Sequence, residues 1–464
     1  MGNSRFMCLL LESAAISWSL PIVIVWAEPR VTVDVAKPSI GELQHFWDST
    51  GLCPSAPNFL LAKDERFNLA LIGSLPHQSI SQVRIHWLLD LITVSSVDES
   101  GTPYYNFTFL DQWIDWLQLY RLNPGFELMG NPSHLFSDFS NSTQAKMWRH
   151  LVREVASRYI GRYGLAAVAQ WRFETWNEPD LKSYNILNFT LQSYLQYFEA
   201  CSAGLQDAAQ GILRLGGPAG LFKTWEKHPL CWGLLQHCTN QTACSLNFIS
   251  FHKKGGGSGS AILEQGLELA HNISIMYPSL RRIPLANEFQ MNNTNPPHVQ
   301  FFKKPVYTAM ALLSLLGNQE LQAAVRMPDD RLSVLAAGSN RQDAWTRSVL
   351  LVFSNNTASQ PDERMNVMLR VLSVQGASPR YTLYLLDDTL TNPAQVWLNA
   401  GAPVFPEQQL RAQLRAVEGP HRVRGPTSVP TLEKLRLLVP LKLPSVALLH
   451  ICSKPTEAPG QVGT

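Results

Sequence analysis

The sequence predicts a mixed α/β chain in which a (β/α)8 barrel of the TIM type is followed by a β-sandwich. Between about residue 30 and about residue 320, short apolar runs alternate with longer amphipathic runs. This alternation is typical of a parallel sheet whose strands are connected by covering helices, and a barrel is its closed form. After residue 320 the apolar runs are short and separated by turns, which indicates a sandwich. We expect the barrel to span 28–320 and the sandwich to span 321–453.

Within the barrel, helices are expected where apolar residues recur three and four apart, and strands where short apolar runs end in Gly or Pro. One such strand, at 213–217, ends in a Gly-Gly-Pro break. The first expected strand begins at residue 83, and further strands are expected at 126–129, 171–176, 213–217, 246–252 and 283–287. Helices are expected at 148–163, 191–209, 261–277 and 306–316. In the sandwich, strands are expected at 348–353, 367–371, 381–386 and 446–451.

The two ends of the chain carry different signals. Residues 1–27 predict a signal peptide, because Arg5 precedes a short apolar stretch and Val25-Trp26-Ala27 fits a cleavage site. Residues 454–464 are rich in Pro and Gly, and we expect them to be disordered. No other stretch is long and apolar enough to span a membrane, so no membrane partner is expected.

Composition narrows the function classes. Hydrophobic residues make up 45% of the 464 residues and the formal net charge is +2, which favours a globular protein and argues against a nucleic-acid partner. No phosphate-binding loop, dinucleotide fingerprint or zinc-ligand spacing is present, so neither a cofactor nor a metal is expected. Seven Asn-x-Ser/Thr sequons suggest glycosylation in the secretory pathway: Asn106, Asn141, Asn188, Asn240, Asn272, Asn292 and Asn355.

Three of the seven cysteines, Cys231, Cys238 and Cys244, lie close together in the sequence. Because no histidines are clustered with them at zinc spacing, a local disulfide is favoured over a metal site. The pairing itself is left open.

The segment WRFETWNEPD, residues 171–180, carries the chemistry. An expected strand ends here, and catalytic groups of a (β/α)8 barrel lie at the carboxyl ends of its strands. Glu178 is therefore the predicted acid/base of a glycoside hydrolase, with Asn177 beside it to hydrogen-bond a sugar hydroxyl. Trp176 is expected to provide an apolar wall that raises the pKa of Glu178.

This segment resembles the acid/base motif of the retaining (β/α)8 glycosidases. The chain is similar to glycoside hydrolase family 39 over nearly its whole length, through segments such as HFWDSTGLCP, QVRIHWLLDL, ISFHKKG and NNTNPPHVQ. The closest resemblance is to the lysosomal members of this family. It implies removal of terminal α-L-iduronic acid from dermatan sulfate and heparan sulfate, in a lysosome reached through the secretory pathway.

The resemblance also implies roles for two further residues. His86, in QVRIHW, matches a histidine at a strand end that contacts the iduronate. Lys254, in FHKKG, matches a lysine near the substrate carboxylate, and an ammonium group can pair with that carboxylate.

The nucleophile is where the sequence departs from the family. A retaining enzyme needs a second carboxylate roughly 5 Å from the acid/base. The nearby carboxylate is Glu288, which, aligned without a gap, matches the residue just before the family's nucleophile. A long block that follows in the family is missing here, as is the family's C-terminal fibronectin-like domain. These omissions suggest a shortened isoform or gene model whose barrel is incomplete at strands 7 and 8, near 288–290.

Three functions are therefore weighed. The first is a retaining glycosidase with Glu178 and Glu288 as its carboxylate pair. The second is a non-hydrolytic variant that lacks the nucleophile and retains glycan binding. The third is another glycosidase of the same clan, such as a β-xylosidase.

Overall fold

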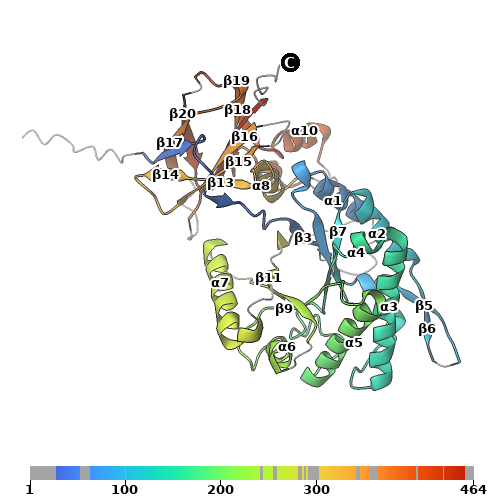
Figure 1. Ribbon diagram of the computed structural model, residues 1–464. Helices are drawn as coiled ribbons and strands as arrows, with labels where there is room; N and C mark the ends of the chain where they lie inside the picture. Colours follow the sequence, from blue (N-terminus) through green and yellow to red (C-terminus); the bar gives the residue numbers. More distant parts are fainter. Residues whose placement is uncertain are drawn as a thin grey trace, which may run out of the picture.

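The computed structural model describes residues 28–52, 63–99, 101–240, 244–253, 259–280, 285–286, 289–290, 302–340, 345–355, 363–403, 406–431 and 433–454. It has two parts, a parallel sheet surrounded by helices and a stack of two mainly antiparallel sheets (Figure 1). The predicted fold class, a barrel followed by a sandwich, is confirmed. The expected signal peptide, 1–27, lies outside the described residues, as does the expected disordered tail apart from Lys454.

The barrel part is built on one sheet in which every neighbouring pair of strands is parallel. Its strand order is β11-β10-β9-β8-β7-β4-β3-β12. The strands follow the chain from β3 to β11, as in a barrel wound in one direction. Their bounds are β3 (Ser49–Leu52), β4 (Gln82–Ile85), β7 (Asn123–Glu127), β8 (Arg172–Glu174), β9 (Leu215–Gly220), β10 (Leu246–Phe251), β11 (Leu285–Ala286) and β12 (Phe289–Gln290).

Helices surround this sheet (Figure 1). In the long helix α3 (Ser142–Tyr163), the buried residues Trp148, Leu151, Val152 and Val155 recur three and four apart. Asn141 caps the start of α3 by accepting the Thr143 N–H at 2.9 Å. The other helices are α1 (Lys63–Gly73), α2 (Thr108–Leu119), α4 (Leu165–Val168), α5 (Leu191–Ala209), α6 (Pro229–Asn240), α7 (Gly259–Met276) and α8 (Pro305–Leu313).

The two edges of the barrel sheet are unusual. β11 pairs with β10 and β12 pairs with β3, yet only two residues separate these two short strands in the chain. Because successive Cα atoms lie 3.8 Å apart, Ala286 and Phe289 are within about 11 Å of each other. The sheet is therefore rolled until its edges nearly meet. The chain passes from one edge to the other without a helix between β11 and β12.

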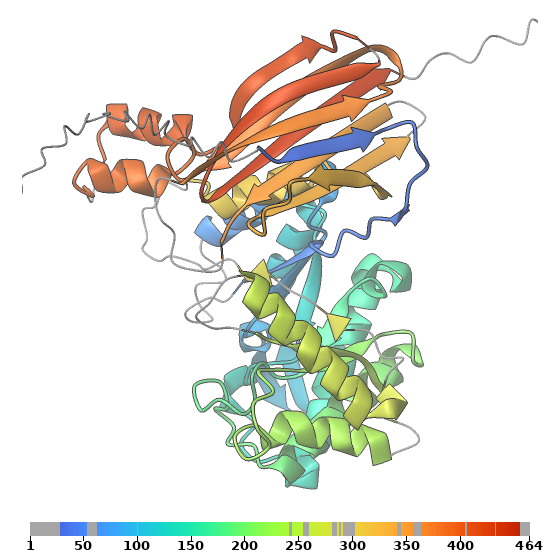
Figure 2. The same ribbon diagram turned by 90° about the vertical axis from the view of Figure 1, so that its left-hand side faces the viewer.

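The sandwich contains a seven-stranded and a four-stranded sheet, stacked beyond the barrel (Figure 2). The seven-stranded order is β19-β18-β21-β16-β15-β13-β2, and the four-stranded order is β14-β1-β17-β20. The strands are β1 (Arg30–Asp34), β2 (Gly41–Glu42), β13 (Gln319–Leu321), β14 (Ala323–Arg326), β15 (Leu332–Asn340), β16 (Trp345–Phe353), β17 (Arg364–Leu372), β18 (Ala377–Asp387), β19 (His421–Ser428), β20 (Lys434–Lys442) and β21 (Ser445–Lys454). Helices α9 (Pro393–Asn399) and α10 (Gln408–Ala416) connect β18 to β19, and the hairpin β5 (Thr93–Val97) and β6 (Pro103–Asn106) extends from the barrel.

The seven-stranded sheet is buried on both faces. Along β16, Val349 and Leu351 belong to the core between the two sheets, whereas Leu350 belongs to the core shared with the barrel. The same alternation separates Leu385 from Leu386 in β18. This explains the unbroken apolar runs of these strands, which are typical of a sheet covered on both sides.

The first described strands belong to the sandwich rather than to the barrel. β1 pairs in parallel with β17, and β2 pairs with β13. The domain range expected from the sequence, 28–320, places both strands in the barrel part. The apolar residues of β1, Val31 and Val33, are instead buried in the core between the two sheets.

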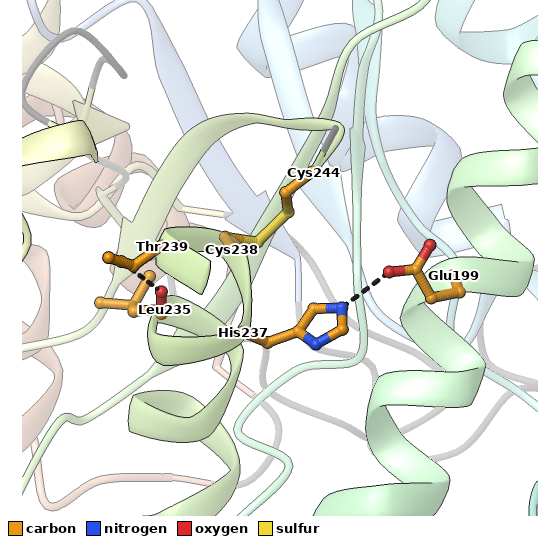
Figure 3. The surroundings of a disulfide bond; sticks show 6 residues. All are labelled: Glu199, Leu235, His237, Cys238, Thr239 and Cys244. Carbon is orange, nitrogen blue, oxygen red and sulfur yellow. Dashed lines mark hydrogen bonds and ion pairs between the residues drawn. A yellow bond between two sulfur atoms is a disulfide. The ribbon is translucent and has the colours of Figure 1, made fainter. Parts of the chain in front are cut away.

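One local disulfide joins Cys238 and Cys244, near the end of α6 (Figure 3). This confirms the local disulfide expected from the spacing of the cysteines, and Cys231 is free and buried. Of the predicted glycosylation sites, Asn292 lies outside the described residues and Asn355 is half-buried. The other five, Asn106, Asn141, Asn188, Asn240 and Asn272, are exposed. In the described part of the chain, the model has no helix with the length and apolarity of a membrane span.

Candidate active site

The candidate site begins with Arg84, a buried arginine in β4 that connects three neighbouring strands. Its guanidinium lies 2.5 Å from Glu127 on β7, forms an ion pair with Glu174 on β8, and donates to the Asn177 side chain at 3.1 Å. All four residues are at least 95% buried. A single planar cation thus compensates two buried carboxylates and orients the predicted sugar-binding amide.

The carboxyl end of β4 also positions His86. Its Nδ1 lies 2.7 Å from both oxygens of Glu127, so Glu127 is shared between His86 and Arg84. The His86 ring contacts Tyr184 edge-on, with centroids 5.8 Å apart. The predicted substrate residue His86 therefore lies in the same buried network as Asn177.

Glu178 follows β8 and is 2% exposed. Its Oε1 lies 2.7 Å from Nδ1 of His252, the residue that follows β10. Burial lowers the pKa of His252, and the Arg84 charge adds to this, although contact with Glu178 acts in the opposite direction. Depending on its tautomer, a neutral imidazole can accept a hydrogen bond from a protonated carboxyl group or donate one to a carboxylate. The contact therefore suits both protonation states that an acid/base must visit.

The backbone at Glu178 is held in an uncommon conformation, with φ at +43°. Two hydrogen bonds fix it there: Glu178 N–H donates to Ala219 O at 3.0 Å, and Leu181 N–H donates to Glu178 O at 2.9 Å. Left-handed backbone at residues other than glycine costs free energy and occurs often at functional sites. The loop after β8 is therefore fixed by its neighbours in a geometry that sets the direction of the Glu178 side chain.

Asp180, two residues further on, connects this loop to helix α6. Its carboxylate accepts the backbone N–H groups of Leu230 at 2.8 Å and Cys231 at 3.0 Å, which are in the first turn of α6. A carboxylate at a helix start also interacts favourably with the helix dipole. The Asn-Glu-Pro-Asp sequence is thus held at Asn177 by Arg84, at Glu178 by His252, and at Asp180 by α6.

The electrostatic surroundings of Glu174 favour its ionised form, which distinguishes it from an acid catalyst. Burial alone would raise the pKa of Glu174, but the Arg84 charge and the hydrogen bonds from Ser250 and Arg84 outweigh burial and hold the pKa below its ordinary value. Glu174 is therefore an ionised partner of Arg84. An acid catalyst instead has to be protonated near the working pH.

Comparison with known proteins shows the family to which this chain belongs. The profile of "Glycosyl hydrolases family 39" matches residues 29–287 and 277–432. The chain belongs to glycosyl hydrolase family 39. It is therefore a member of a glycoside hydrolase family, as predicted.

Several family 39 proteins are similar to the chain. It is 37% identical to the α-L-iduronidase of Canis lupus familiaris, over 95% of this chain and 81% of the relative. It is 36% identical to the α-L-iduronidase of Homo sapiens, over 98% and 83%. A solved structure described as the bacterial orthologue of human α-L-iduronidase superposes with a TM-score of 0.79 at 25% identity, over 93% of this chain and 85% of that one. The family 39 enzyme of Xanthomonas axonopodis pv. citri shares the fold, with a TM-score of 0.74 at 19% identity, over 93% and 98%.

The match to the family 39 profile is divided into two segments. The segments 29–287 and 277–432 overlap at 277–287, immediately before the place where the sequence departs from the family. The alignment with the dog enzyme extends over 534 positions, whereas the chain has 464 residues, so at least 70 positions hold residues of the relative alone. This break coincides with the two-residue strands β11 and β12.

The predicted site residues differ in how far the structure describes them. His86, Asn177 and Glu178 are brought together at the carboxyl ends of β4 and β8. Lys254 and Glu288 lie outside the described residues. Trp176 is fully buried and contacts Trp87 edge-on at 6.1 Å, and its proposed influence on Glu178 stays a prediction.

Four site residues were not predicted from the sequence: Arg84, Glu127, Glu174 and His252. Each lies within or next to an expected strand, and Arg84 and His252 belong to the segments QVRIHW and ISFHKKG. The available signal was a charged residue inside an apolar strand of a barrel, where a charge has to be paired to be buried. The partner of each buried charge lies on a neighbouring strand, and the tertiary structure determines which strands are neighbours.

Proposed function

We propose that the chain is a retaining exo-glycosidase that removes terminal α-L-iduronic acid from dermatan sulfate and heparan sulfate in the lysosome. The observation that carries this proposal is the buried pair of Glu178 and His252 within a family 39 chain that is 36–37% identical to mammalian α-L-iduronidases. Delivery through the secretory pathway is part of the proposal, supported by the exposed sequons.

In the proposed mechanism, Glu178 protonates the glycosidic oxygen as the bond to the leaving sugar breaks. A second carboxylate attacks the anomeric carbon and forms a glycosyl-enzyme. Glu178, now ionised, then removes a proton from the water that releases iduronic acid with retention. His252 contacts Glu178 throughout, and Asn177, held by Arg84, hydrogen-bonds a sugar hydroxyl.

We assign the nucleophile to Glu288. Ala286 pairs with Ser250 across β11 and β10. In the sequence, Glu288 follows Ala286 by two residues, as His252 follows Ser250 by two residues. The described carboxylates nearest in the network, Glu127 and Glu174, are already held by Arg84. For the substrate carboxylate, Lys254 is the proposed cation.

A second candidate function is favoured by the break in the family match. A chain that has lost the nucleophile would bind terminal iduronate without hydrolysing it. A third, β-xylosidase activity, is suggested only by more distant relatives, such as the β-xylosidase of Caldicellulosiruptor saccharolyticus, which is 23% identical over 84% of this chain and 91% of that enzyme.

The test is hydrolysis of a fluorogenic α-L-iduronide and of the matching β-xyloside by the purified chain at acidic pH. We expect release of the fluorophore from the iduronide alone. Release from the xyloside alone would support the third function. Saturable binding of iduronic acid by a folded chain that releases neither fluorophore would support the second.

A further inference from the structure

The outer face of the four-stranded sheet is strongly basic. Along β17 and β20, buried residues alternate with residues that point away from the core. The outward positions of β1, β14, β17 and β20 include seven cationic residues, which we call the basic face: Arg30, Arg326, Arg364, Arg370, Lys434, Arg436 and Lys442. In the described part of this sheet, Asp34 is the acidic residue at an outward position, and Glu28 lies two residues before β1.

These cations face one another in pairs. The strand register places Arg370 directly opposite Arg436, and Arg364 directly opposite Lys442. On the same face, between β1 and β14 at the other edge of the sheet, Arg30 lies opposite Arg326. Like charges at directly opposed positions of a sheet destabilise it. Three such pairs on one face are a cost to folding that an anionic partner would remove.

Two carboxylates that flank the basic face interact with groups other than its cations. Glu363 precedes Arg364 but forms its ion pair with Arg331. Glu28 accepts a hydrogen bond from Asn366 at 3.1 Å. Among the described contacts, neither Glu363 nor Glu28 forms an ion pair with Arg364, Arg370 or Arg436, so these two carboxylates do not offset the charge of those arginines.

Between the two cation pairs of β17 and β20, the basic face has apolar and amide groups. Met368 lies opposite Leu438, which is 51% exposed, and Asn366 lies opposite Pro440. From Arg364 to Arg370 the strand rises about 20 Å. A linear ligand lying along the strands would meet cations at both ends and an apolar strip between them, where the carbon face of a sugar ring can pack.

The basic face points away from the catalytic part of the molecule. The seven-stranded sheet lies between it and the barrel, because its two faces contribute to two separate cores. Figure 2 shows this stacking, with β1, in blue, on the sheet that bears the basic face. The basic face is thus separate from the site around Glu178.

We propose that the basic face is a second binding site, for the sulfated chain of a glycosaminoglycan. Sulfate groups spaced along a polysaccharide match cations spaced along two neighbouring strands, and arginine pairs strongly with such anions. Bound there, the polymer raises the local concentration of its ends near the barrel. This role in presenting substrate rests on the proposed function, whereas the binding itself does not.

The test compares binding of immobilised heparin by the parent chain, by the double variant Arg370→Gln/Arg436→Gln, and by the control Arg66→Gln/Arg121→Gln. The control removes two exposed arginines from the barrel part and changes the net charge equally. We expect the first double variant to lose about tenfold in heparin affinity and to elute at lower salt. The control should elute with the parent, and fully desulfated heparin should not be retained.

Two further readouts separate a binding role from a structural one. The double variant should unfold at an unchanged or higher temperature, because a repulsive pair is removed. It should hydrolyse the small fluorogenic iduronide as the parent does. Equal heparin elution by both double variants, or binding of phosphatidylserine vesicles in place of heparin, would overturn the proposal. If no chain hydrolyses the iduronide but the heparin difference is found, the proposed function fails and the basic face stands.

Discussion

The two halves of the barrel differ in how well they can support catalysis. The half from β4 to β10 has strands of three to six residues, and it holds the buried groups Arg84, Asn177, Glu178 and His252 in mutual contact. The half formed by β11 and β12 consists of two strands of two residues each. The proposed mechanism uses Glu178 from the first half and Glu288, which follows β11 in the sequence, as its two carboxylates. The proposed acid/base is thus held by several described contacts, whereas the proposed nucleophile belongs to the part of the barrel with the shortest strands.

The largest effect is expected from Glu178→Gln. Removing the proposed acid/base should lower turnover of a substrate with a poor leaving group by about 10²- to 10⁴-fold. A substrate whose leaving group needs no protonation should lose far less in the bond-breaking step. Steady-state kinetics on both substrates measures this difference. Glu199→Gln is the matched control, since Glu199 contacts His237 at 2.7 Å but is exposed (Figure 3). Equal losses for the two variants would show that Glu178 has no special role.

The next effect concerns stability. Arg84→Met leaves Glu127 and Glu174 buried without their cation, which should cost about 3–5 kcal/mol of unfolding free energy. Arg162→Met breaks a largely exposed pair with Asp115 and should cost about 1 kcal/mol at most. Urea unfolding of the two variants gives the comparison. Similar losses would mean that the buried network does not organise this half of the barrel.

A third prediction addresses the contact between the barrel and the sandwich. His450 on β21 lies 2.9 Å from Ser348, whose hydroxyl donates to Leu315 O. Burial, with a smaller contribution from His77, lowers the pKa of His450 to about 4. The unfolded chain therefore binds the proton more readily, so stability is present in full above about pH 6.5 and is lost as the pH falls toward 4. In the His450→Asn variant, the loss of unfolding free energy between about pH 6.5 and pH 4 should be smaller than in the parent, by up to about 3 kcal/mol. Thermal unfolding across this pH range checks it, and a slope identical to the parent's would contradict it.

The smallest effect is expected for the disulfide. Cys238 and Cys244 are six residues apart, so opening the bond with Cys238→Ser/Cys244→Ser should lower stability by about 2 kcal/mol through loop-closure entropy. Activity should be unchanged, because the bond lies at the end of α6 away from its first turn, which Asp180 holds. Unfolding under reducing conditions provides the control, since reduction should bring the parent to the stability of the variant.

The sequence predicted what local pattern encodes. The strand that ends before Asn177 and Glu178, the apolar strands of the sandwich, and the local disulfide all follow from spacing and residue type. Arg84 and His252 could not be assigned, because their roles depend on contacts across neighbouring strands. The pairing of β1 with β17 joins residues more than 330 positions apart, and no local pattern in RVTVD predicts that partner.

The most direct test of the account is to find which residue becomes glycosylated during turnover. The folded chain would be incubated with a 2-fluoro α-L-iduronosyl fluoride, which forms a long-lived glycosyl-enzyme, and then digested and mapped by mass spectrometry. We expect one label, on Glu288, and none in the Glu288→Gln variant. A label on another carboxylate, or no label in a chain that is folded and binds heparin, would contradict it.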